Sequence, residues 1–335
     1  MIWLLIFIIS IIVLFWSGSR LVKGLIKMAV YLGWREFVVA FFIVAFAGAV
    51  PNLFIGINSA LHGIPELSFG EILGGNVVDL TLAVALAVLV GGNVLQAKSK
   101  MVQSSTIFTS VVAILPLILI IDGRLGRIDG AVLLLAFIFY VVWLFSKEER
   151  FRKVYKGKLK EENAFRKFVT FVKKRKEPKI IKEFKIFVRG MWRVVSSLIL
   201  LMLASWGIVR SAQFFAGYFN VSLPIVGIFL VGLGNALPET YFAIISARKG
   251  QTWMILGDLM GSVIVCATLI LGVVALIAPI EIVELSTLAI ARVFLVISAV
   301  FFLVIVRTGQ KITKKEAAIL LIIYLSFIIT EFLLT

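Results

Sequence analysis

Long runs of apolar residues alternate with short polar stretches along almost the whole chain of 335 residues. A transmembrane helix needs about 20 mostly apolar residues, and ten stretches approach that length. They lie at residues 2–28, 36–61, 68–92, 103–121, 128–146, 191–217, 222–247, 252–277, 288–307 and 315–334. The pattern predicts an all-α polytopic membrane protein with ten transmembrane helices.

The composition agrees with this pattern. Hydrophobic residues make up 61% of the chain and the mean hydropathy is +1.10, which is more than a water-soluble core of this length requires. The single cysteine, Cys266, excludes an intrachain disulfide and falls within a predicted span. We therefore expect a multi-pass protein of the cell membrane.

Positive charge is concentrated in one segment. The net charge is +16, and the stretch from Lys147 to Arg193 holds 18 Lys and Arg residues against 6 Asp and Glu. Basic runs such as KKRK (173–176) also occur in nucleic-acid-binding proteins. In a membrane protein they indicate a cytoplasmic loop under the positive-inside rule, so we expect no nucleic-acid partner. Apolar residues interleaved with the charges predict amphipathic helices that lie against anionic lipid.

A cytoplasmic loop at residues 147–190 fixes the predicted topology. It follows five spans, so the N-terminus is expected outside, and ten spans place the C-terminus outside as well. Loops predicted outside read HGIPEL, AGYFNVS and APIEIVE, without Lys or Arg, whereas RTGQKITKKE (307–316) is predicted inside. DGRLGR (122–127) is the exception to this charge pattern.

The two halves of the chain repeat each other at a constant offset of 187 residues. GAVPNLFIGINSALHG (48–63) aligns with NALPETYFAIISARKG (235–250), and GEILGGNVVDLTLA (70–83) aligns with GDLMGSVIVCATLI (257–270). Each half has five predicted spans, an odd number, so the halves enter the membrane from opposite sides. This is the architecture of many secondary transporters, which hold their substrate near the bilayer midplane.

We therefore predict three parts. Residues 1–146 form a first five-helix repeat with its signature at 48–83, and residues 147–190 form the basic loop. Residues 191–335 form a second five-helix repeat with its signature at 232–270.

Prolines interrupt the predicted spans 2 and 7. Pro51 precedes Asn52, and Pro238 precedes Glu239 in GNALPE (234–239). A proline leaves backbone carbonyls without donors, and inside a membrane a cation can satisfy them. We expect broken helices at the midplane, with Glu239 supplying charge for a hard cation. The alternative is a buried proline kink beside a protonated Glu239.

Carboxylates inside spans indicate function, because one at a helix centre costs at least about 2.5–3.5 kcal/mol. The repeat brings equivalent points of spans 2, 3, 7 and 8 around one axis. Those points are Asn52, Asp79, Glu239 and Cys266. The GxxxG pairs 70/74 and 257/261 allow close helix approach there. Glu71 and Asp258 lie near the start of their predicted spans, and we interpret them as cap or mouth residues.

GNALPE (234–239) followed by GDLMGS (257–262) resembles the second-repeat signature of the calcium/cation antiporter superfamily, which includes the sodium/calcium exchangers. The family pattern is G-T-S-x-P-E followed by G-N-x-x-G-S-N-x-x-N/D. GAVPN (48–52) and GEILGGNVVD (70–79) match the first-repeat signature more loosely. The resemblance covers nearly the whole chain except the basic loop. It implies ten spans arranged as two inverted five-helix repeats.

The resemblance also implies ion ligands by position. Glu239 would be a principal calcium-type ligand. Asn52 takes the place of its symmetry-related Glu, and Asp79 takes that of a family Asn. Two carboxylates, Asp79 and Glu239, still neutralise one divalent ion.

Three further positions follow from the same resemblance. Cys266 stands where an acidic or amide residue is usual, and Ser262 matches a family Ser that helps to bind sodium. Asn235, with Ala236, replaces the Thr-Ser pair of the second signature. A thiol suits soft metals better than calcium, although a small packing residue also explains Cys266.

The expected function is a secondary active antiporter that exchanges Ca2+ against Na+ or H+ by alternating access. Fewer oxygen ligands than in the family predict coupling to fewer sodium ions, or to protons through Asp79 or Glu239. The chain has no GxxxxGK[ST] motif for ATP, so an ion gradient must drive transport, and no cofactor is expected beside the transported ions. An antiporter for Mg2+, K+ or a transition metal is the alternative.

Two other classes of protein share part of this pattern. An intramembrane protease would use Asp79 and Glu239 as carboxyls that share a proton, but the Gly-x-Gly-Asp motif of such proteases is absent, so we do not expect an enzyme. A non-transporting homologue with an altered site is distinguished by a flux measurement. A monomer is the working expectation for the oligomeric state.

Overall fold

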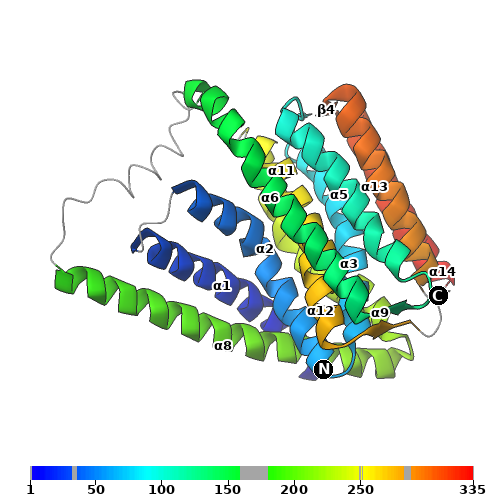
Figure 1. Cartoon of the computed structure of the whole chain (residues 1–335). Helices are drawn as coiled ribbons and strands as arrows, with labels where there is room; N and C mark the ends of the chain where they lie inside the picture. Colours follow the sequence, from blue (N-terminus) through cyan, green and yellow to red (C-terminus); the bar gives the residue numbers. More distant parts are fainter. Residues whose placement is uncertain are drawn as a thin grey trace.

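The computed structural model describes residues 2–31, 36–158, 180–248, 250, 252–282 and 288–334. Almost all of these residues are helical (Figure 1). The elements up to residue 158 are α1 (Ile2–Tyr31), α2 (Glu36–Leu61), α3 (Pro65–Val78), the π-helical turn η1 (Asp79–Ala83), α4 (Val84–Leu89), β1 (Leu95–Gln96), α5 (Lys100–Leu119), β2 (Arg124–Leu125) and α6 (Arg127–Lys158).

The elements after residue 179 follow a similar order. They are α8 (Ile180–Phe219), α9 (Leu223–Val226), the π-helical turn η2 (Gly227–Gly232), α10 (Leu233–Arg248), α11 (Thr252–Ile264), the π-helical turn η3 (Val265–Ile270), α12 (Leu271–Ile277), β3 (Ile280–Glu281), α13 (Ala289–Gly309), β4 (Lys311–Ile312) and α14 (Lys314–Leu334). Within the predicted loop 147–190, the backbone is helical up to Lys158 in α6 and from Ile180 in α8. Residues 159–179 and the side chains on either side of them lie outside the described structure, so the predicted amphipathic faces and lipid contacts stay a prediction.

Eight helices are long and apolar enough to cross a bilayer, judged on the described residues alone. Two shorter apolar helices, Ile2–Gly18 and Ala49–Leu61, come from α1 and α2. The outward faces carry large apolar side chains such as Trp192, Leu203 and Leu135, each more than 60% exposed. Water would disfavour so much exposed apolar surface, so these faces contact lipid. The prediction of a multi-pass membrane protein is confirmed.

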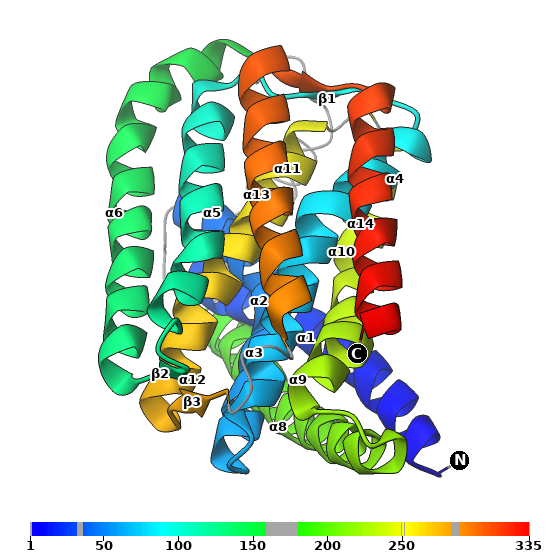
Figure 2. The same ribbon diagram turned by 90° about the vertical axis from the view of Figure 1, so that its right-hand side faces the viewer.

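The largest buried core joins α3–η1–α4, α10, α11–η3–α12, α5, α13 and α14, and it includes side chains of α2 and α6 as well. Figure 2 shows α5, α6, α13 and α14 standing upright around this core. α1 and α8 pack side by side and run obliquely beneath the bundle (Figures 1 and 2). Leu14 and Ile208 are fully buried in their shared apolar core.

A polar contact links this oblique pair to the bundle. Asn58 on α2 donates a side-chain hydrogen bond to the hydroxyl of Ser205 on α8, and both residues are buried. A buried amide needs such a partner, because leaving it unpaired costs about 1–3 kcal/mol. The contact fixes α8 against the helix that carries Asn52.

The helices do not break at the two prolines as predicted. α2 continues through Pro51 and α10 continues through Pro238. Each proline still leaves the carbonyl four residues earlier without its usual helical donor. The departures from α-helical geometry lie instead in η1, η2 and η3. Such π-turns accommodate an extra residue within a continuous helix and often occur at functional sites.

Two short antiparallel strand pairs join the parts of the chain on either side of the basic loop. β1 pairs with β4 at one end of the bundle, and β2 pairs with β3 at the other end (Figure 2). Arg124 on β2 contacts Glu281 on β3, with 3.4 Å between Nε and Oε1. Arg124 belongs to DGRLGR, the loop that departs from the predicted charge pattern, and here its charge faces a carboxylate.

Backbone conformations recur at the 187-residue offset. Gly63 and Gly250 both have a φ of 71°. Gly123 and Gln310, also 187 residues apart, have φ values of 86° and 49°. The left-handed conformation suits glycine but is unfavourable for other L-residues by about 1–2 kcal/mol. Gln310 therefore adopts a left-handed conformation at a position where the other half of the chain has a glycine, Gly123.

We expect Gln310→Gly to raise the free energy of unfolding by about 0.5–1 kcal/mol, because glycine is the preferred residue at a left-handed helix end. Thermal unfolding of the purified protein in detergent, followed by tryptophan fluorescence, measures the change. Gly123→Ala is the matched reverse substitution and should lower the unfolding temperature. An unchanged or lower unfolding temperature for Gln310→Gly would contradict the conformational assignment at this helix end.

α3 and the α9–η2 segment touch backbone to backbone. A Cβ atom built on Gly70 would lie 2.1 Å from the carbonyl oxygen of Pro224, and one on Gly74 would lie 2.5 Å from that of Ile228. The first GxxxG pair thus permits close helix approach, as predicted. The second pair differs: within the described structure, a Cβ on Gly257 or Gly261 meets nothing within 4 Å.

Candidate cation-binding cavity

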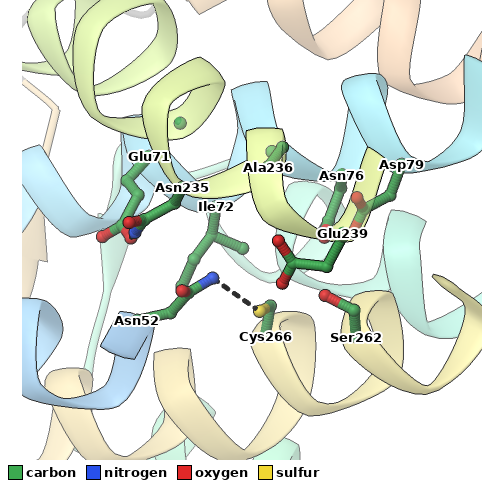
Figure 3. Close-up of a pocket in the computed structure, with 12 residues that line it drawn as sticks. Asn52, Glu71, Ile72, Asn76, Asp79, Asn235, Ala236, Glu239, Ser262 and Cys266 are labelled. Atoms are coloured by element: carbon green, nitrogen blue, oxygen red, sulfur yellow. Dashed lines mark hydrogen bonds between the residues drawn. The ribbon is translucent and has the colours of Figure 1, made fainter. Parts of the chain in front are cut away.

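Four helical rods supply the lining of a small cavity inside the bundle (Figure 3). They are α2, α3–η1, η2–α10 and α11–η3, and η1 contacts α10 while η3 contacts α2. The lining residues are Asn52, Glu71, Ile72, Gly75, Asn76, Asp79, Gly232, Asn235, Ala236, Glu239, Ser262 and Cys266. All six side chains predicted as metal ligands are among them: Asn52, Asp79, Asn235, Glu239, Ser262 and Cys266. Their role as ligands stays a prediction.

The irregular positions of the helices carry the central side chains. Asp79 is the first residue of η1, and its counterpart 187 residues later, Cys266, is the second residue of η3. Asn52 and Glu239 each follow a proline within a helix. The same local geometry in both halves therefore presents two pairs of equivalent side chains to one cavity.

Hydrogen bonds cross the cavity between the halves. Asn52 Nδ2 donates to Cys266 Sγ over 3.3 Å, as drawn in Figure 3. Asn235 Nδ2 donates to Glu71 Oε1. Each bond joins one residue from before the basic loop to one from after it.

Several oxygen atoms in the cavity have no hydrogen-bond partner in the described structure. They are Asn52 Oδ1, Glu71 Oε2, Asp79 Oδ1, Asn235 Oδ1 and Glu239 Oε2. The lining includes no Lys, Arg or His, and Asp79 and Glu239 are only 4% and 7% exposed. Unpaired buried oxygens and uncompensated carboxylates are unfavourable. A bound cation removes both penalties, since hard cations take oxygen ligands.

Glu71 was wrongly interpreted as a cap or mouth residue. Its side chain is 1% exposed and lines the cavity. The span was predicted to begin at residue 68, but α3 begins at Pro65, so Glu71 lies one turn deeper. The sequence held a signal for this: Glu71, Gly75 and Asp79 are spaced by four residues and share one helix face. Asp258, its counterpart in the other half, is half-buried and outside the lining.

The cavity is too small for an organic substrate. Its volume is about 10 Å3, which is close to the room for one water molecule. Within the described residues, no three carboxylate, thiol or imidazole groups lie together as a metal site. An ion held here would need amide and backbone oxygens beside the carboxylates.

Comparison with known proteins agrees with a cation-transporting fold. The family model described as "Sodium/calcium exchanger protein" matches residues 2–146 and 189–333, most of the chain. The chain belongs to the sodium/calcium exchanger family. Membership of this family confirms the resemblance that GNALPE and GDLMGS indicated. The relatives that the family groups with this chain are transporters.

Individual relatives match over almost their full length. The sodium/calcium exchanger MaX1 of Methanosarcina acetivorans is 24% identical, with 98% of each chain covered. The inner membrane protein YrbG of Escherichia coli is 24% identical, over 88% of this chain and 86% of that protein. Among solved structures, the sodium-calcium exchanger NCX_Mj, soaked with Na+ and Sr2+, superposes with a TM-score of 0.60 at 20% identity, covering 98% of each chain. This superposition shows that the exchanger fold is shared.

Proposed function

We propose that this member of the exchanger family is a secondary antiporter that exchanges a divalent cation, Ca2+, against Na+ or H+ in the cavity between α2, α3–η1, α10 and α11–η3. The observation that carries the proposal is the set of five unpaired acceptor oxygens in a lining without a cationic side chain. Acceptor oxygens with net negative charge suit a hard cation. The exchangers among its relatives support the same conclusion.

In this proposal Asp79 and Glu239 neutralise the divalent ion. Asn52, Asn235 and Ser262 contribute further oxygens, and the carbonyls freed by Pro51 and Pro238 complete the shell. The thiol of Cys266 accepts a hydrogen bond from Asn52, so it orients the amide oxygen and does not need to contact the ion.

The proposed architecture is ten transmembrane helices as two inverted five-helix repeats, residues 1–146 and 191–335, joined by the basic loop 147–190. The two segments matched by the family model begin 187 residues apart and end 187 residues apart, the offset of the internal repeat. The strand pairs support it too, because each unites one strand from each half. We propose that both termini face outside and that the basic loop is cytoplasmic.

The test is 45Ca2+ uptake into proteoliposomes that contain the purified protein. We expect uptake to be driven by an outward Na+ gradient or by an outward H+ gradient, and the gradient that works identifies the coupling ion. Protein-free liposomes and an ionophore that collapses the gradient are the controls. No uptake of Ca2+ under either gradient, with protein shown to be folded and oriented both ways, would reject Ca2+ as the substrate.

A further inference from the structure

One end of the bundle gathers positively charged side chains from both halves of the chain. It is the end at which α5 begins, α13 ends and α14 begins, joined by the β1–β4 strand pair (Figure 2). Six exposed Lys and Arg residues lie within or next to this pair: Lys98, Lys100, Arg307, Lys311, Lys314 and Lys315. We call these six side chains the β1–β4 patch.

Hydrogen bonds hold the two segments of the patch together. β1 and β4 pair in antiparallel orientation, and the amide of Ala97 donates to the carbonyl of Gln310 over 2.9 Å. Gln103 Nε2 donates to the carbonyls of Ala97 and Val306, at 2.7 and 2.8 Å. This side chain ties the first turn of α5 to the last turn of α13. The cations before and after the basic loop therefore lie on one surface of the folded protein.

The protein supplies little negative charge against this patch. Within the described residues none of the six cations is ion-paired, and the ion pair found there joins Arg124 to Glu281 at the opposite end of the bundle. One carboxylate, Glu316, lies in the same segments. Its Oε2 accepts hydrogen bonds from the backbone amide and the hydroxyl of Thr313, so it caps the start of α14. The patch therefore keeps a strong positive charge that favours an anionic ligand.

Lipid-facing apolar side chains lie next to the patch on all three helices. Val304 on α13, Ile319 on α14 and Ile107 on α5 are 48%, 44% and 42% exposed. Val304 lies about one helical turn before Arg307, and Ile319 lies about one turn after Lys315. The cations thus begin where the apolar outer surface ends. In a bilayer this is the level of the lipid headgroups.

We propose that the β1–β4 patch binds the headgroup phosphate of an anionic phospholipid in the leaflet at that end of the bundle. Lys and Arg clusters at the ends of transmembrane helices attract anionic lipid, and their N–H groups donate charge-assisted hydrogen bonds to phosphate oxygens. Lys98 and Lys311 come from different halves, so one bound headgroup bridges the halves. The patch is separate from the basic loop 147–190, and the inference holds whichever ion the cavity transports.

The test is thermal unfolding of the purified full-length protein in an uncharged detergent, with increasing phosphatidylglycerol or, in parallel, phosphatidylcholine. We expect phosphatidylglycerol to raise the unfolding temperature by about 3 °C more than phosphatidylcholine, because a ligand of the folded state stabilises it. The double variant Lys98→Gln/Lys311→Gln should need at least about 10-fold more phosphatidylglycerol for half of this shift. Arg124→Gln/Arg127→Gln removes two charges at the β2–β3 end and should keep the midpoint of the unmodified protein.

Three outcomes would overturn the proposal. The first is an equal shift with the two lipids, and the second is an unchanged midpoint in Lys98→Gln/Lys311→Gln or an equal increase in the control variant. The third is the full shift from glycerophosphoglycerol, the headgroup without acyl chains, which would identify a soluble anion as the ligand. Lys314→Gln/Lys315→Gln gives an independent variant if the first does not fold, and its midpoint should rise in the same way.

Discussion

Glu239→Gln is expected to reduce divalent-cation exchange by at least about 100-fold, because removing one charge of a buried, matched set costs about 3–5 kcal/mol. Glutamine preserves the size and one oxygen of the side chain, so packing around Pro238 is retained. The loss is therefore electrostatic. 45Ca2+ uptake into proteoliposomes under the driving gradient measures it, with equal amounts of reconstituted protein.

Glu281→Gln is the matched control for this substitution. Glu281 lies on β3 with its side chain 66% exposed and contacts Arg124, and it is not one of the residues that line the cavity. The exchange rate of this variant should stay close to that of the unmodified protein. Asp79→Asn should resemble Glu239→Gln, since both carboxylates are assigned to the same ion. Exchange that survives in both variants would show that the ion binds elsewhere.

Gly70→Ala is expected to destabilise the protein by about 3 kcal/mol, because overpacking at a tight contact costs about 1–3 kcal/mol and here the obstacle is backbone. The new methyl group would lie 2.1 Å from the carbonyl oxygen of Pro224 and 2.8 Å from its Cα atom. A carbonyl cannot rotate away like a flexible side chain, so α3 and α9 must move apart. Thermal unfolding in detergent and the yield of monodisperse protein measure the effect.

Gly257→Ala is the control from the other half. Gly257 is the counterpart of Gly70 at the 187-residue offset, but a Cβ there meets nothing within 4 Å in the described structure. Alanine also favours a helix over glycine by up to about 1 kcal/mol. The unfolding temperature of Gly257→Ala should be unchanged or higher. Equal destabilisation of both variants would contradict the packing difference between the two GxxxG pairs.

The positions of most helices follow directly from hydropathy. The predicted spans 36–61 and 252–277 have the bounds of α2 and of α11–η3–α12. Span 68–92 was displaced by three residues from the rod Pro65–Leu89. Hydropathy does not detect helix ends, whereas Pro65 at the first helical turn and the turn at Gly91 and Gly92 do mark them. Because the predicted start of this span was three residues too late, Glu71 was predicted nearer to the membrane surface than it lies.

Hydropathy did not predict where the helices stay continuous or where they form π-turns. A proline in a span indicated a break, yet α2 and α10 remain helical through Pro51 and Pro238. Contacts from neighbouring rods hold such helices together, and no local sequence pattern records them. The same holds for the π-turns and for strand pairs of two residues, which depend on partners from the other half of the chain.

Most residues of the candidate site could be predicted from the internal repeat. A constant offset pairs Asn52 with Glu239 and Asp79 with Cys266, and the structure places all four in one lining. The repeat could not predict which side-chain contacts differ between the two halves. Glu71 is buried against Asn235, whereas the counterpart of Asn235 is Gly48, which has no side chain to bond Asp258. Departures from symmetry of this kind require contacts between the halves.

The strand pairs also constrain the order in which the chain is completed during synthesis. β2 has no partner until residues 280–281 have been made, and β1 has none until residues 311–312 follow. The connections around α5 therefore stay open while nearly all of the second half is translated and inserted. A ribosome-bound chain that stops before residue 280 would expose both strands at opposite ends of the bundle. Every truncated product that ends before residue 280 would therefore lack both strand pairs.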